Sequence, residues 1–487
     1  MTDILITHSF FLRFDPKQWR AMMPYPPLGT LYAAAVLERQ GFSVALFDTM
    51  LAASEEELHD HCRRHRPAVV AIYDDDFNYL NKMCLSRMRE GAFRMSEIAK
   101  SYGAFVVVHG SDATDHAEEY LAHSADAVIV GEGEAMLGRV CDQVLRQRKI
   151  ALDDLPGVAF IRDGVVTRTK RNSPSRDLDG FPFPAWHLVD VEKYRETWMK
   201  HHGYFSLNMV TTRGCPYRCN WCAKPIYGQV YNSRSPENVV EELQYLVTSF
   251  APDHIWFADD IFGLKPGWVQ HFADLVGKKR ILVRYKIQSR ADLLLEPNTV
   301  ESLARSGCGE AWIGAESGSQ KILDAMEKGI RVSQIYEARQ LLKSYGVRSA
   351  FFLQFGYPGE TREDIEATIR MVRDLMPDDL GISVSYPLPG TKFYENVKAG
   401  LMAKKNWVDS NDLALMFRGT YSPAYYRRLH RYVHRVFRLR KGIREIVDLI
   451  AWKTSPSMKR LRSAILVGFF APAALLDRWM LFFLVRE

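Results

Sequence analysis

The sequence of 487 residues is poor in cysteine, with only seven, and has no uninterrupted apolar run of the roughly 18 residues that a membrane-spanning helix needs. The longest apolar stretch begins at residue 464 and ends at Asp477 and Arg478. Low-complexity tracts and short repeats are also absent, which excludes collagen-like and solenoid architectures. The first residues, MTDILITHSF, lack the basic and apolar regions of a secretory signal. We therefore expect a cytoplasmic protein, in which clustered thiols are more often metal ligands than disulfides.

The composition is that of an ordinary folded protein, with 47% hydrophobic and 25% charged residues. The length predicts two or three domains. The net charge of +6 is unevenly placed, because fifteen Lys or Arg face only four Asp or Glu from Phe417 to Glu487. The basic character therefore belongs to the C-terminal region.

Residues 1–150 alternate short apolar runs with helical patterns. The strand candidates are DILIT, SVALFD, AVVAIY, AFVVVHG and DAVIVGEGE. This rhythm predicts a doubly wound parallel sheet with helices on both faces. Ligands of such sheets bind at the carboxyl ends of the strands. The loops to consider are residues 7–28, 73–78, 110–114 and 131–134.

Residues 151–204 are predicted to be a linker, because 171–190 are rich in Pro, Asp and Ser and show no periodicity. From 205 to 400 a second series of six strand candidates alternates with helical patterns, one of which has Ser235 as its N-cap. This series predicts a partial (β/α)6 TIM-type barrel whose active site lies at the carboxyl ends of the strands. Polar or glycine-rich clusters follow these strands, including Asp259/Asp260, Glu316/Ser317 and GYPGET. Residues 401–487 are predicted to be a helical, basic region.

The segment RGCPYRCNWC (213–222) contains three of the seven cysteines, Cys215, Cys219 and Cys222. A structural zinc or a ferredoxin-type cluster usually takes four protein ligands. Three thiolates hold three irons of a four-iron cluster and leave the fourth open, which implies chemistry at the open iron. The alternatives are a non-catalytic cluster or zinc protein that acts as a scaffold, and buried cysteines without a ligand. The polar residues of the segment disfavour a core strand.

The C-x-x-x-C-x-x-C motif with an aromatic residue before its last cysteine resembles the radical S-adenosylmethionine (SAM) enzymes. The resemblance continues through FADDIF, QSRADLL, GAESGSQKILDAMEKG and FGYPGET. It implies a four-iron four-sulfur cluster that binds and reductively cleaves SAM, and an electron donor such as flavodoxin or ferredoxin. Trp221 matches the aromatic residue near the adenine. By the same match, the candidates to contact SAM or substrate are Arg290, Glu316, Ser317, Asp259 and Asp260.

The first 150 residues resemble the cobalamin-binding domain of class B radical SAM enzymes, through MPYPPLGTLYAAAVLERQGF and VHGSDATDHAEEYLAHSADAVIVGEGE. The resemblance implies cobalamin, with Gly110, Ser111, Gly131 and Glu132 as candidate contacts. Two departures stand out. No D-x-H-x-x-G motif surrounds His8, so no histidine ligand to cobalt is evident. The loop YDDDFN (73–78) adds three negative charges where a phosphate-bearing tail would thread.

Within class B, the sequence looks closest to the anaerobic magnesium-protoporphyrin IX monomethyl ester cyclase group. We expect methyl transfer to, or oxidation and cyclisation of, a small hydrophobic substrate such as a porphyrin or isoprenoid. The alternative within the superfamily is an enzyme that has lost cobalamin and only abstracts hydrogen. The C-terminal region is expected either to cap the barrel or to contact a membrane peripherally. Nucleic-acid binding is not expected, because its aromatics form no stacking platform.

Overall fold

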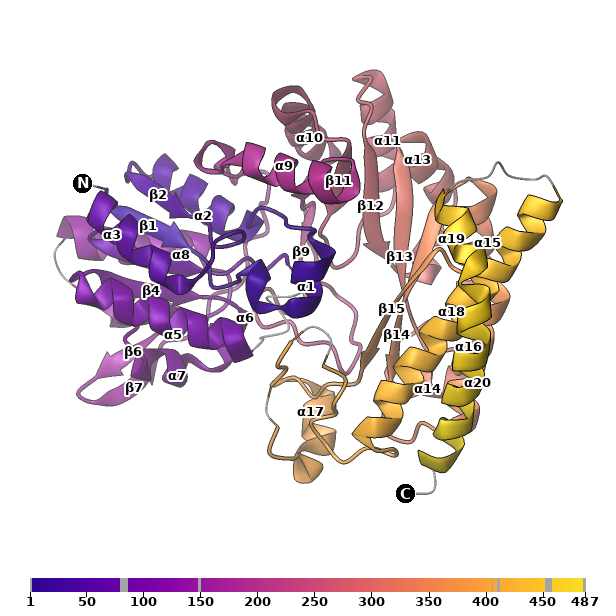
Figure 1. The fold of residues 1–487 in the computed structure, drawn as a ribbon. Coiled ribbons are helices and arrows are strands. Elements are labelled where there is room, and N and C mark those ends of the chain that lie inside the picture. Colours follow the sequence, from indigo (N-terminus) through magenta and orange to yellow (C-terminus); the bar gives the residue numbers. More distant parts are fainter. Residues whose placement is uncertain are drawn as a thin grey trace.

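The computed structural model describes residues 2–78, 86–147, 150–404, 406–409, 412–451 and 458–484. It contains two large, mainly parallel sheets, each covered by helices, and a set of C-terminal helices along one outer edge (Figure 1). The N-terminal sheet lies at the opposite end of the molecule from these helices, with the second sheet between them (Figure 1). The predicted α/β fold class is therefore confirmed.

The N-terminal sheet has seven strands in the order β2-β1-β3-β4-β5-β6-β7. The first five are parallel, and β6 and β7 run antiparallel to their neighbours. The strands are β1 (Ile4–Thr7), β2 (Val44–Phe47), β3 (Val69–Tyr73), β4 (Phe105–His109), β5 (Ala127–Ile129), β6 (Val158–Arg162) and β7 (Val165–Arg168). The helices are α1 (Pro16–Ala21), α2 (Leu28–Arg39), α3 (Leu58–His65), α5 (Ser86–Ser101), α6 (Ser111–Asp115), α7 (Ala117–Ala122) and α8 (Glu134–Asp142). Helices α2 and α8 cover one face of the sheet, and α3, α5 and α7 cover the other.

The β6–β7 hairpin lies within the segment predicted to be a linker. Its two strands meet at Asp163 and Gly164, both of which have positive φ angles (49° and 77°). Two-residue hairpin turns favour Asp-Gly for this reason. The first sheet therefore extends to Arg168, and helix α9 (Val191–His202) then leads to the second sheet.

The second sheet contains six parallel strands in the order β15-β14-β13-β12-β11-β8, which form an open half-barrel. Its strands are β8 (Ser206–Met209), β11 (His254–Phe257), β12 (Arg284–Ser289), β13 (Cys308–Glu316), β14 (Arg348–Phe355) and β15 (Asp379–Val384). Its helices are α10 (Pro236–Phe250), α11 (Trp268–Lys278), α12 (Ala291–Leu294), α13 (Thr299–Arg305), α14 (Gln320–Ala325), α15 (Val332–Ser344), α16 (Arg362–Leu375) and α17 (Lys392–Val397). All six predicted strands are present. Ser235 caps α10 as predicted, since its side chain accepts a hydrogen bond from the Asn238 N–H.

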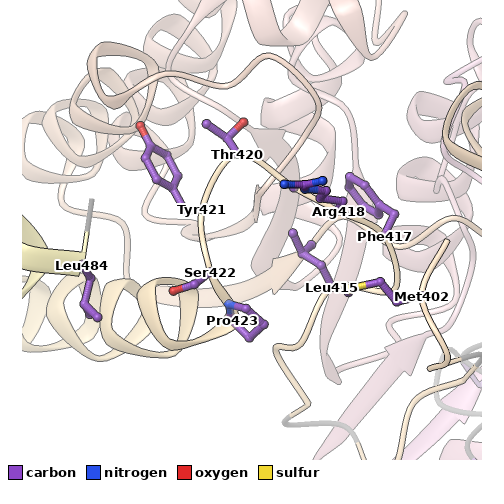
Figure 2. Close-up of a pocket in the computed structure, with 10 residues that line it drawn as sticks. Met402, Leu415, Phe417, Arg418, Thr420, Tyr421, Ser422, Pro423 and Leu484 are labelled. Carbon is purple, nitrogen blue, oxygen red and sulfur yellow. The ribbon is translucent and has the colours of Figure 1, made fainter. Parts of the chain in front are cut away.

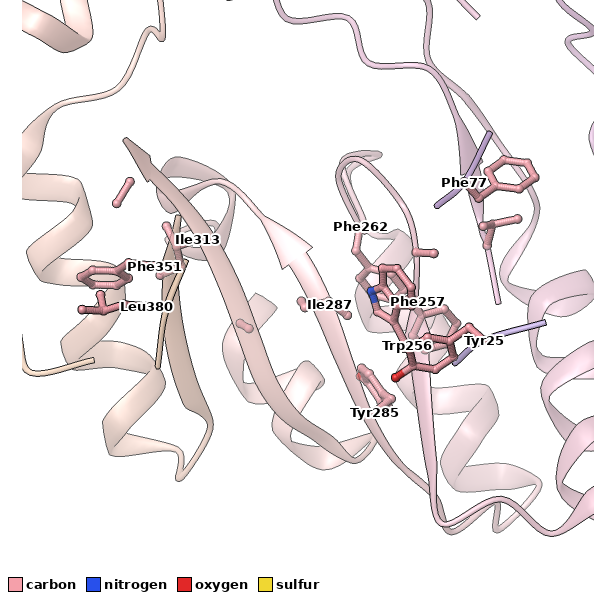
Figure 3. Close-up of a cluster of buried hydrophobic side chains, with 14 of the residues drawn as sticks. Tyr25, Phe77, Trp256, Phe257, Phe262, Tyr285, Ile287, Ile313, Phe351 and Leu380 are labelled. Atoms are coloured by element: carbon pink, nitrogen blue, oxygen red, sulfur yellow. The ribbon is translucent and has the colours of Figure 1, made fainter. Parts of the chain in front are cut away.

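Aromatic packing joins the two sheets. The Tyr25 ring, from the first domain, lies 4.8 Å from the Trp256 ring on β11 (Figure 3). The Tyr25 hydroxyl also bonds to Ser206 on β8, and the Trp198 indole N–H donates to the Pro24 carbonyl. Because these groups are buried, the first domain is packed firmly against the edge of the half-barrel.

The C-terminal region is helical, as predicted, with α18 (Pro423–Ile450), α19 (Met458–Ile465) and α20 (Val467–Leu484). Within the described ranges, only α20 has the length and hydropathy of a membrane-crossing segment (18 residues, mean hydropathy 1.5). It lies alongside α18 at the outer edge of the molecule (Figure 1).

Candidate functional site

The three clustered cysteines lie on a loop that follows β9 (Thr212–Arg213), a short strand paired with β10 (Asn232–Ser233). The loop begins at Gly214, whose φ is 79° and whose Cβ position would lie 2.4 Å from the Val230 carbonyl oxygen. Only glycine tolerates this close approach together with a left-handed conformation. Cys215, Cys219 and Cys222 form no disulfide, so all three thiols can serve as ligands.

Contacts with the barrel fix the far side of the cysteine loop. The Asn220 amide donates to the Ala325 carbonyl at 2.8 Å, and the Tyr357 hydroxyl donates to the Asn220 side-chain oxygen at 3.0 Å. The Asn220 backbone N–H donates to the Met326 carbonyl. The loop is therefore held between the ends of α14 and β14, which limits the freedom of the cysteines on either side.

Burial raises the pKa of the Cys222 thiol to about 12, and the nearby Asp260 carboxylate adds to the effect. Iron must displace this proton, because only the thiolate binds metal. Among the described residues, no group of three or more His, Cys, Asp or Glu converges on a single ion. A four-iron cluster does not need such convergence, since each cysteine binds a different iron. Three thiols on one short loop suit a cluster in which each cysteine binds a different iron.

Asp259 and Asp260, predicted together, have different surroundings. Asp259 is buried and accepts four hydrogen bonds of 2.7–2.9 Å from the N–H and hydroxyl groups of Thr211 and Thr212. Burial raises the pKa of Asp259 to about 6 despite these bonds. Asp260 lines the large cavity described below. Asp259 therefore holds the start of the cysteine loop, and its neighbour faces the ligand space.

Glu316 and Ser317, at the end of β13, are both buried. Glu316 has a φ of 56° and pairs with Lys328 at 2.9 Å. Burial opposes the charge of Lys328, yet the Glu316 carboxylate raises the pKa of the lysine above its usual range. The Ser317 hydroxyl bonds to that of Thr368 at 3.0 Å. The left-handed conformation at Glu316 costs energy in a non-glycine residue, and such strain is often found at functional sites.

Arg290, at the end of β12, contacts the cysteine loop directly. Its guanidinium lies 3.6 Å from the centre of the Tyr217 ring and pairs with Asp292 at 3.0 Å. Arg290 thus lies beside the residue between the first two cysteines. The structure brings the predicted SAM-contacting residues Arg290, Glu316 and Trp221 to one end of the half-barrel, at the carboxyl ends of its strands.

The predicted cobalamin contacts follow strands of the first sheet. Ser111 begins α6 and lines the large cavity, and its hydroxyl donates to Asp76 at 3.3 Å. Gly110 precedes it, and its Cβ position would lie 2.9 Å from a carboxylate oxygen of Asp74. The Gly131 Cβ position would lie 2.5 Å from the Arg171 Nε. Both glycines therefore leave room for a neighbouring side chain.

Glu132 joins the two domains. It pairs with Arg213 at 2.6 Å, and the second arm of the same guanidinium pairs with Glu134 at 2.7 Å. Arg213 is 4% exposed and directly precedes the cysteine loop. Arg213 was not predicted as a site residue from the sequence, although it is the first residue of the RGCPYRCNWC segment.

The loop YDDDFN places less charge in the ligand space than its sequence suggests. Asp74 accepts hydrogen bonds from the N–H and hydroxyl of Ser9, and Asp75 accepts from the N–H groups of Gly29 and Phe77. Of the three aspartates, only Asp76 lines the cavity. The charge count alone therefore overstated the repulsion toward a phosphate-bearing tail.

His8 is fully buried and bonds to other residues through both ring nitrogens. Its Nε2 lies 3.0 Å from Asp48, and its Nδ1 lies 3.0 Å from the Thr49 hydroxyl. These partners occupy the ring, so His8 is not placed to bind cobalt from below.

A cavity of about 600 Å³ connects the two domains. The cysteine loop contributes Trp221 and Cys222, the first domain contributes Asp76 and Ser111, and Asp260 lies at the end of β11. Strands β13–β15 supply a mostly apolar wall, which consists of Trp312, Phe352, Leu353, Gln354, Leu380, Ile382 and Val384. The Trp221 indole N–H and the Gln354 side-chain oxygen are buried without a partner in the described structure. Unpaired buried polar groups of this kind are costly unless a ligand completes them.

The donor sets and the cavity fit the implied groups. Three thiols suit the cluster, and Trp221 and Cys222 open onto the same space as Asp76 and Ser111 of the first domain. A corrin between the domains would thus face the cysteine loop across one continuous cavity.

Two family models match the chain. The model of the Radical SAM superfamily matches residues 209–372, and that of the B12 binding domain matches residues 21–140. The first contains all three clustered cysteines, and the second contains the YDDDFN loop and Ser111.

Curated relatives align with most of the chain. An uncharacterized methyltransferase of Pyrococcus horikoshii is 28% identical over 392 residues, which cover 78% of this chain and 81% of the relative. The anaerobic magnesium-protoporphyrin IX monomethyl ester cyclase of Rubrivivax gelatinosus is 25% identical over 387 residues, which cover 77% of this chain and 66% of the relative.

Two solved structures share the fold. The cobalamin-dependent SAM radical enzyme OxsB, with aqua-cobalamin bound, superposes with a TM-score of 0.73 at 16% identity, covering 99% of this chain and 72% of that one. The radical SAM methyltransferase TsrM of Kitasatospora setae, with cobalamin and a 4Fe-4S cluster bound, gives 0.62 at 18% identity, covering 79% and 75%. The order of the two sheets along the chain thus recurs in both.

Proposed function

This chain joins a B12-binding domain to a radical SAM domain, and we propose that it is an enzyme that modifies a hydrophobic substrate in the cavity between them. The modification is methyl transfer or oxidative ring closure. The observation that carries the proposal is the cavity of about 600 Å³, which is reached by Cys222 from one domain and by Ser111 from the other. The cofactors are a four-iron four-sulfur cluster, SAM and cobalamin.

When bound, these cofactors supply one-electron cleavage of SAM and methyl-group transfer. The residues of the chain itself orient the cysteine loop and shield the cavity. Asp259 and Asn220 fix the cysteine loop on two sides, and Trp221 offers a flat aromatic face and an unpaired N–H at the cavity wall. Glu316, with its Lys328 partner, places a carboxylate at the end of β13, where it can accept a hydrogen bond from the amino group of SAM.

The wall formed by β13–β15 favours an apolar substrate. Trp312 and Phe352 pack with their ring centres 4.7 Å apart, and both line the cavity. Excluding water from this space protects a radical from side reactions. Gln354 adds one polar group among apolar neighbours, which is how ligand pockets usually fix orientation. A porphyrin or an isoprenoid has the matching chemistry.

Both reaction types have relatives that support them. The first relative above is named a methyltransferase, and the second is named a cyclase. The reductant is proposed to be a small electron-transfer protein such as flavodoxin or ferredoxin, because reductive cleavage of SAM needs an external electron. Catalysis in the cytoplasm is proposed as well.

The test begins with cofactor retention. The protein is purified without oxygen, its cluster is rebuilt, hydroxocobalamin is added, and iron and cobalt are counted after desalting. We expect about one cobalt per chain together with the cluster, as for one corrinoid between two domains. A Ser111→Leu variant narrows the cavity from the first domain and should lose cobalt while it keeps iron. Iron without cobalt in the unaltered protein would contradict a cobalamin enzyme.

Product analysis then separates the two reaction types. Methyl transfer converts SAM to S-adenosylhomocysteine in proportion to methylated product, whereas oxidation without methyl transfer gives methionine and 5′-deoxyadenosine and no S-adenosylhomocysteine. Porphyrins and isoprenoid lipids are the substrates to offer first. Cleavage of SAM that survives replacement of all three cysteines by alanine would rule out the catalytic proposal.

A further inference from the structure

The outer face of α20 exposes a continuous apolar stripe. Its residues recur at intervals of three, four or seven along the helix, so they share one side. Each is between 42% and 68% exposed, far more than a core side chain. We call this set the α20 stripe, and it consists of Phe469, Leu475, Leu476, Trp479, Phe482 and Phe483.

The opposite side of α20 is fixed to α18. Asp477 is fully buried and pairs with Arg428 at 2.8 Å and with Arg435 at 2.7 Å. Near the start of α20, Gly442 lets the chain pack closely, because its Cβ position would lie 2.5 Å from Val467. These contacts hold the stripe outward and the helix antiparallel to α18.

This arrangement favours a helix that lies along a surface over one that crosses a membrane. A spanning α20 would carry Asp477 and its two arginine partners into hydrocarbon together with the rest of the arginine-rich α18, at high cost. A helix with one strongly apolar face and charged neighbours lies instead at the level of the lipid headgroups.

A cluster of arginines borders the stripe. A groove of about 200 Å³ runs between α16 and α20, and its apolar lining includes Leu481 and the stripe residue Phe482. Arg362 bonds to Glu366 at 2.9 Å, and all four of the groove's arginines are exposed. We call this the arginine groove, lined by Arg362, Arg370, Arg373 and Arg478 with Glu366 as its one carboxylate.

A second hollow lies at the C-terminal end of α20. It has a volume of about 220 Å³, and its wall combines Leu484 with Phe417, Tyr421 and the exposed Arg418 (Figure 2). The pattern of the arginine groove, apolar side chains beside an exposed arginine, is thus repeated at this end of the helix.

We propose that the α20 stripe and the arginine groove dock this protein on an anionic lipid bilayer. The stripe enters the boundary between headgroups and acyl chains, and the arginines bind lipid phosphates, which match guanidinium geometry. Trp479 is of the residue type enriched at this depth. The stripe and groove share no residue with the cavity of about 600 Å³, so docking leaves the reaction site accessible.

Charge argues for lipid over a second copy of this chain. Four arginines against one glutamate would face the same excess in a symmetric dimer, and like charges would repel across the interface. An anionic bilayer supplies the opposite charge over the whole face.

The test is flotation of the full-length protein with vesicles of phosphatidylcholine, alone or with about 30% phosphatidylglycerol, to give a negative surface. We expect binding to the anionic vesicles, weakened by salt, and little binding to the neutral ones. Absence of binding to the anionic vesicles overturns the proposal. Equal binding to both kinds also overturns it, because the arginines would then have no part.

Two variants separate the stripe from the groove. Trp479→Glu/Phe483→Glu should abolish flotation, and Arg370→Ala/Arg373→Ala should weaken it about fivefold for each arginine removed. Leu282→Glu is the matched control, since Leu282 is 90% exposed on a different surface. The control should float like the unaltered protein. Flotation that survives the stripe substitutions overturns the proposal.

The oligomeric state of the same proteins is measured by light scattering. A dimer that dissociates in Trp479→Glu/Phe483→Glu, with no flotation of the unaltered protein, would assign the face to a second copy and overturn the proposal. A monomer that floats supports it.

Discussion

The two domains use aspartates at the carboxyl ends of their strands in the same way, but attach different loops to them. In the barrel, Asp259 is buried under four hydrogen bonds while Asp260 lines the cavity. In the first domain, Asp74 and Asp75 are turned inward and Asp76 lines the same cavity. In both domains, therefore, the earlier aspartates of the run bond to backbone N–H groups, and the last one lines the cavity.

The difference lies in what each aspartate holds. Asp259 anchors a segment that leads to three cysteines, so its effect reaches a metal site through the chain. Asp74 and Asp75 anchor Ser9 and Gly29, which carry no ligand. Equal strand-end chemistry therefore positions a loop of metal ligands in one domain and only shapes the cavity in the other.

The cysteines give the sharpest contrast. Cys219→Ala should reduce bound iron and SAM cleavage to background, because two thiolates do not hold a four-iron cluster in place. Cys141→Ala, which alters a buried thiol of the first domain, should keep both. Bound iron is measured as iron content per chain, and SAM cleavage is measured as 5′-deoxyadenosine formation, in both variants. Equal loss of iron and of SAM cleavage in the two variants would show that the clustered cysteines have no special role in binding the cluster.

Arg213 links the two regions, and its removal should have the next largest effect. Arg213→Met leaves Glu132 and Glu134 buried without their cation and should lower the free energy of unfolding by about 3–5 kcal/mol. Arg94→Met breaks the exposed pair with Glu56 and should leave the free energy of unfolding almost unchanged, because solvent screens that pair. Urea unfolding compares them. Similar costs for both would show that the bridge is not a stabilising contact.

Stability should depend on pH through Asp74. Burial raises the pKa of Asp74 to about 6 from a usual value near 3.8, so the folded state binds more protons than the unfolded state between these values. Unfolding free energy therefore falls as pH rises from about 4 to about 6, by roughly 3 kcal/mol for this group. The loss is absent below this window and complete above it.

Asp74→Asn tests this dependence. The amide does not ionise, so the free energy of unfolding of the variant should fall less steeply between about pH 4 and about pH 6. Urea unfolding at each pH measures this. An unchanged slope would mean that Asp74 does not titrate in this range.

The neighbouring aspartates of the barrel should separate stability from turnover. Asp259→Asn loses charge-assisted bonds to Thr211 and Thr212 and should cost about 2 kcal/mol, with looser iron binding. Asp260→Asn should leave stability and iron unchanged and alter SAM or substrate binding. Thermal unfolding and iron content are the measurements. The reverse pattern would exchange the two roles.

Most of the architecture follows from sequence periodicity. The five parallel strands of the first sheet and the six of the barrel are short apolar runs between helical patterns, and their burial enforces that pattern. The β6–β7 hairpin was missed although Asp163-Gly164 between alternating residues is a recognised turn signal. The linker was predicted because residues 171–190, which follow the hairpin, are rich in Pro, Asp and Ser.

The candidate site was less accessible from sequence. Spacing alone indicated the three cysteines, because their chemistry needs close thiols. It did not distinguish Asp259 from Asp260, since the local backbone decides which neighbour faces inward. Lys328 lay inside a quoted motif, but its pairing with Glu316 spans twelve residues and depends on the turn after α14.

The bridge at Arg213 also has a consequence for the order in which the protein is made. The first domain leaves the ribosome with Glu132 and Glu134 side by side on one turn, before the arginine that neutralises both has been synthesised. Until β9 is synthesised, these two carboxylates repel each other without a neutralising cation. The same arginine precedes the cysteine loop, so the electrostatic completion of the first domain coincides with the emergence of the metal ligands.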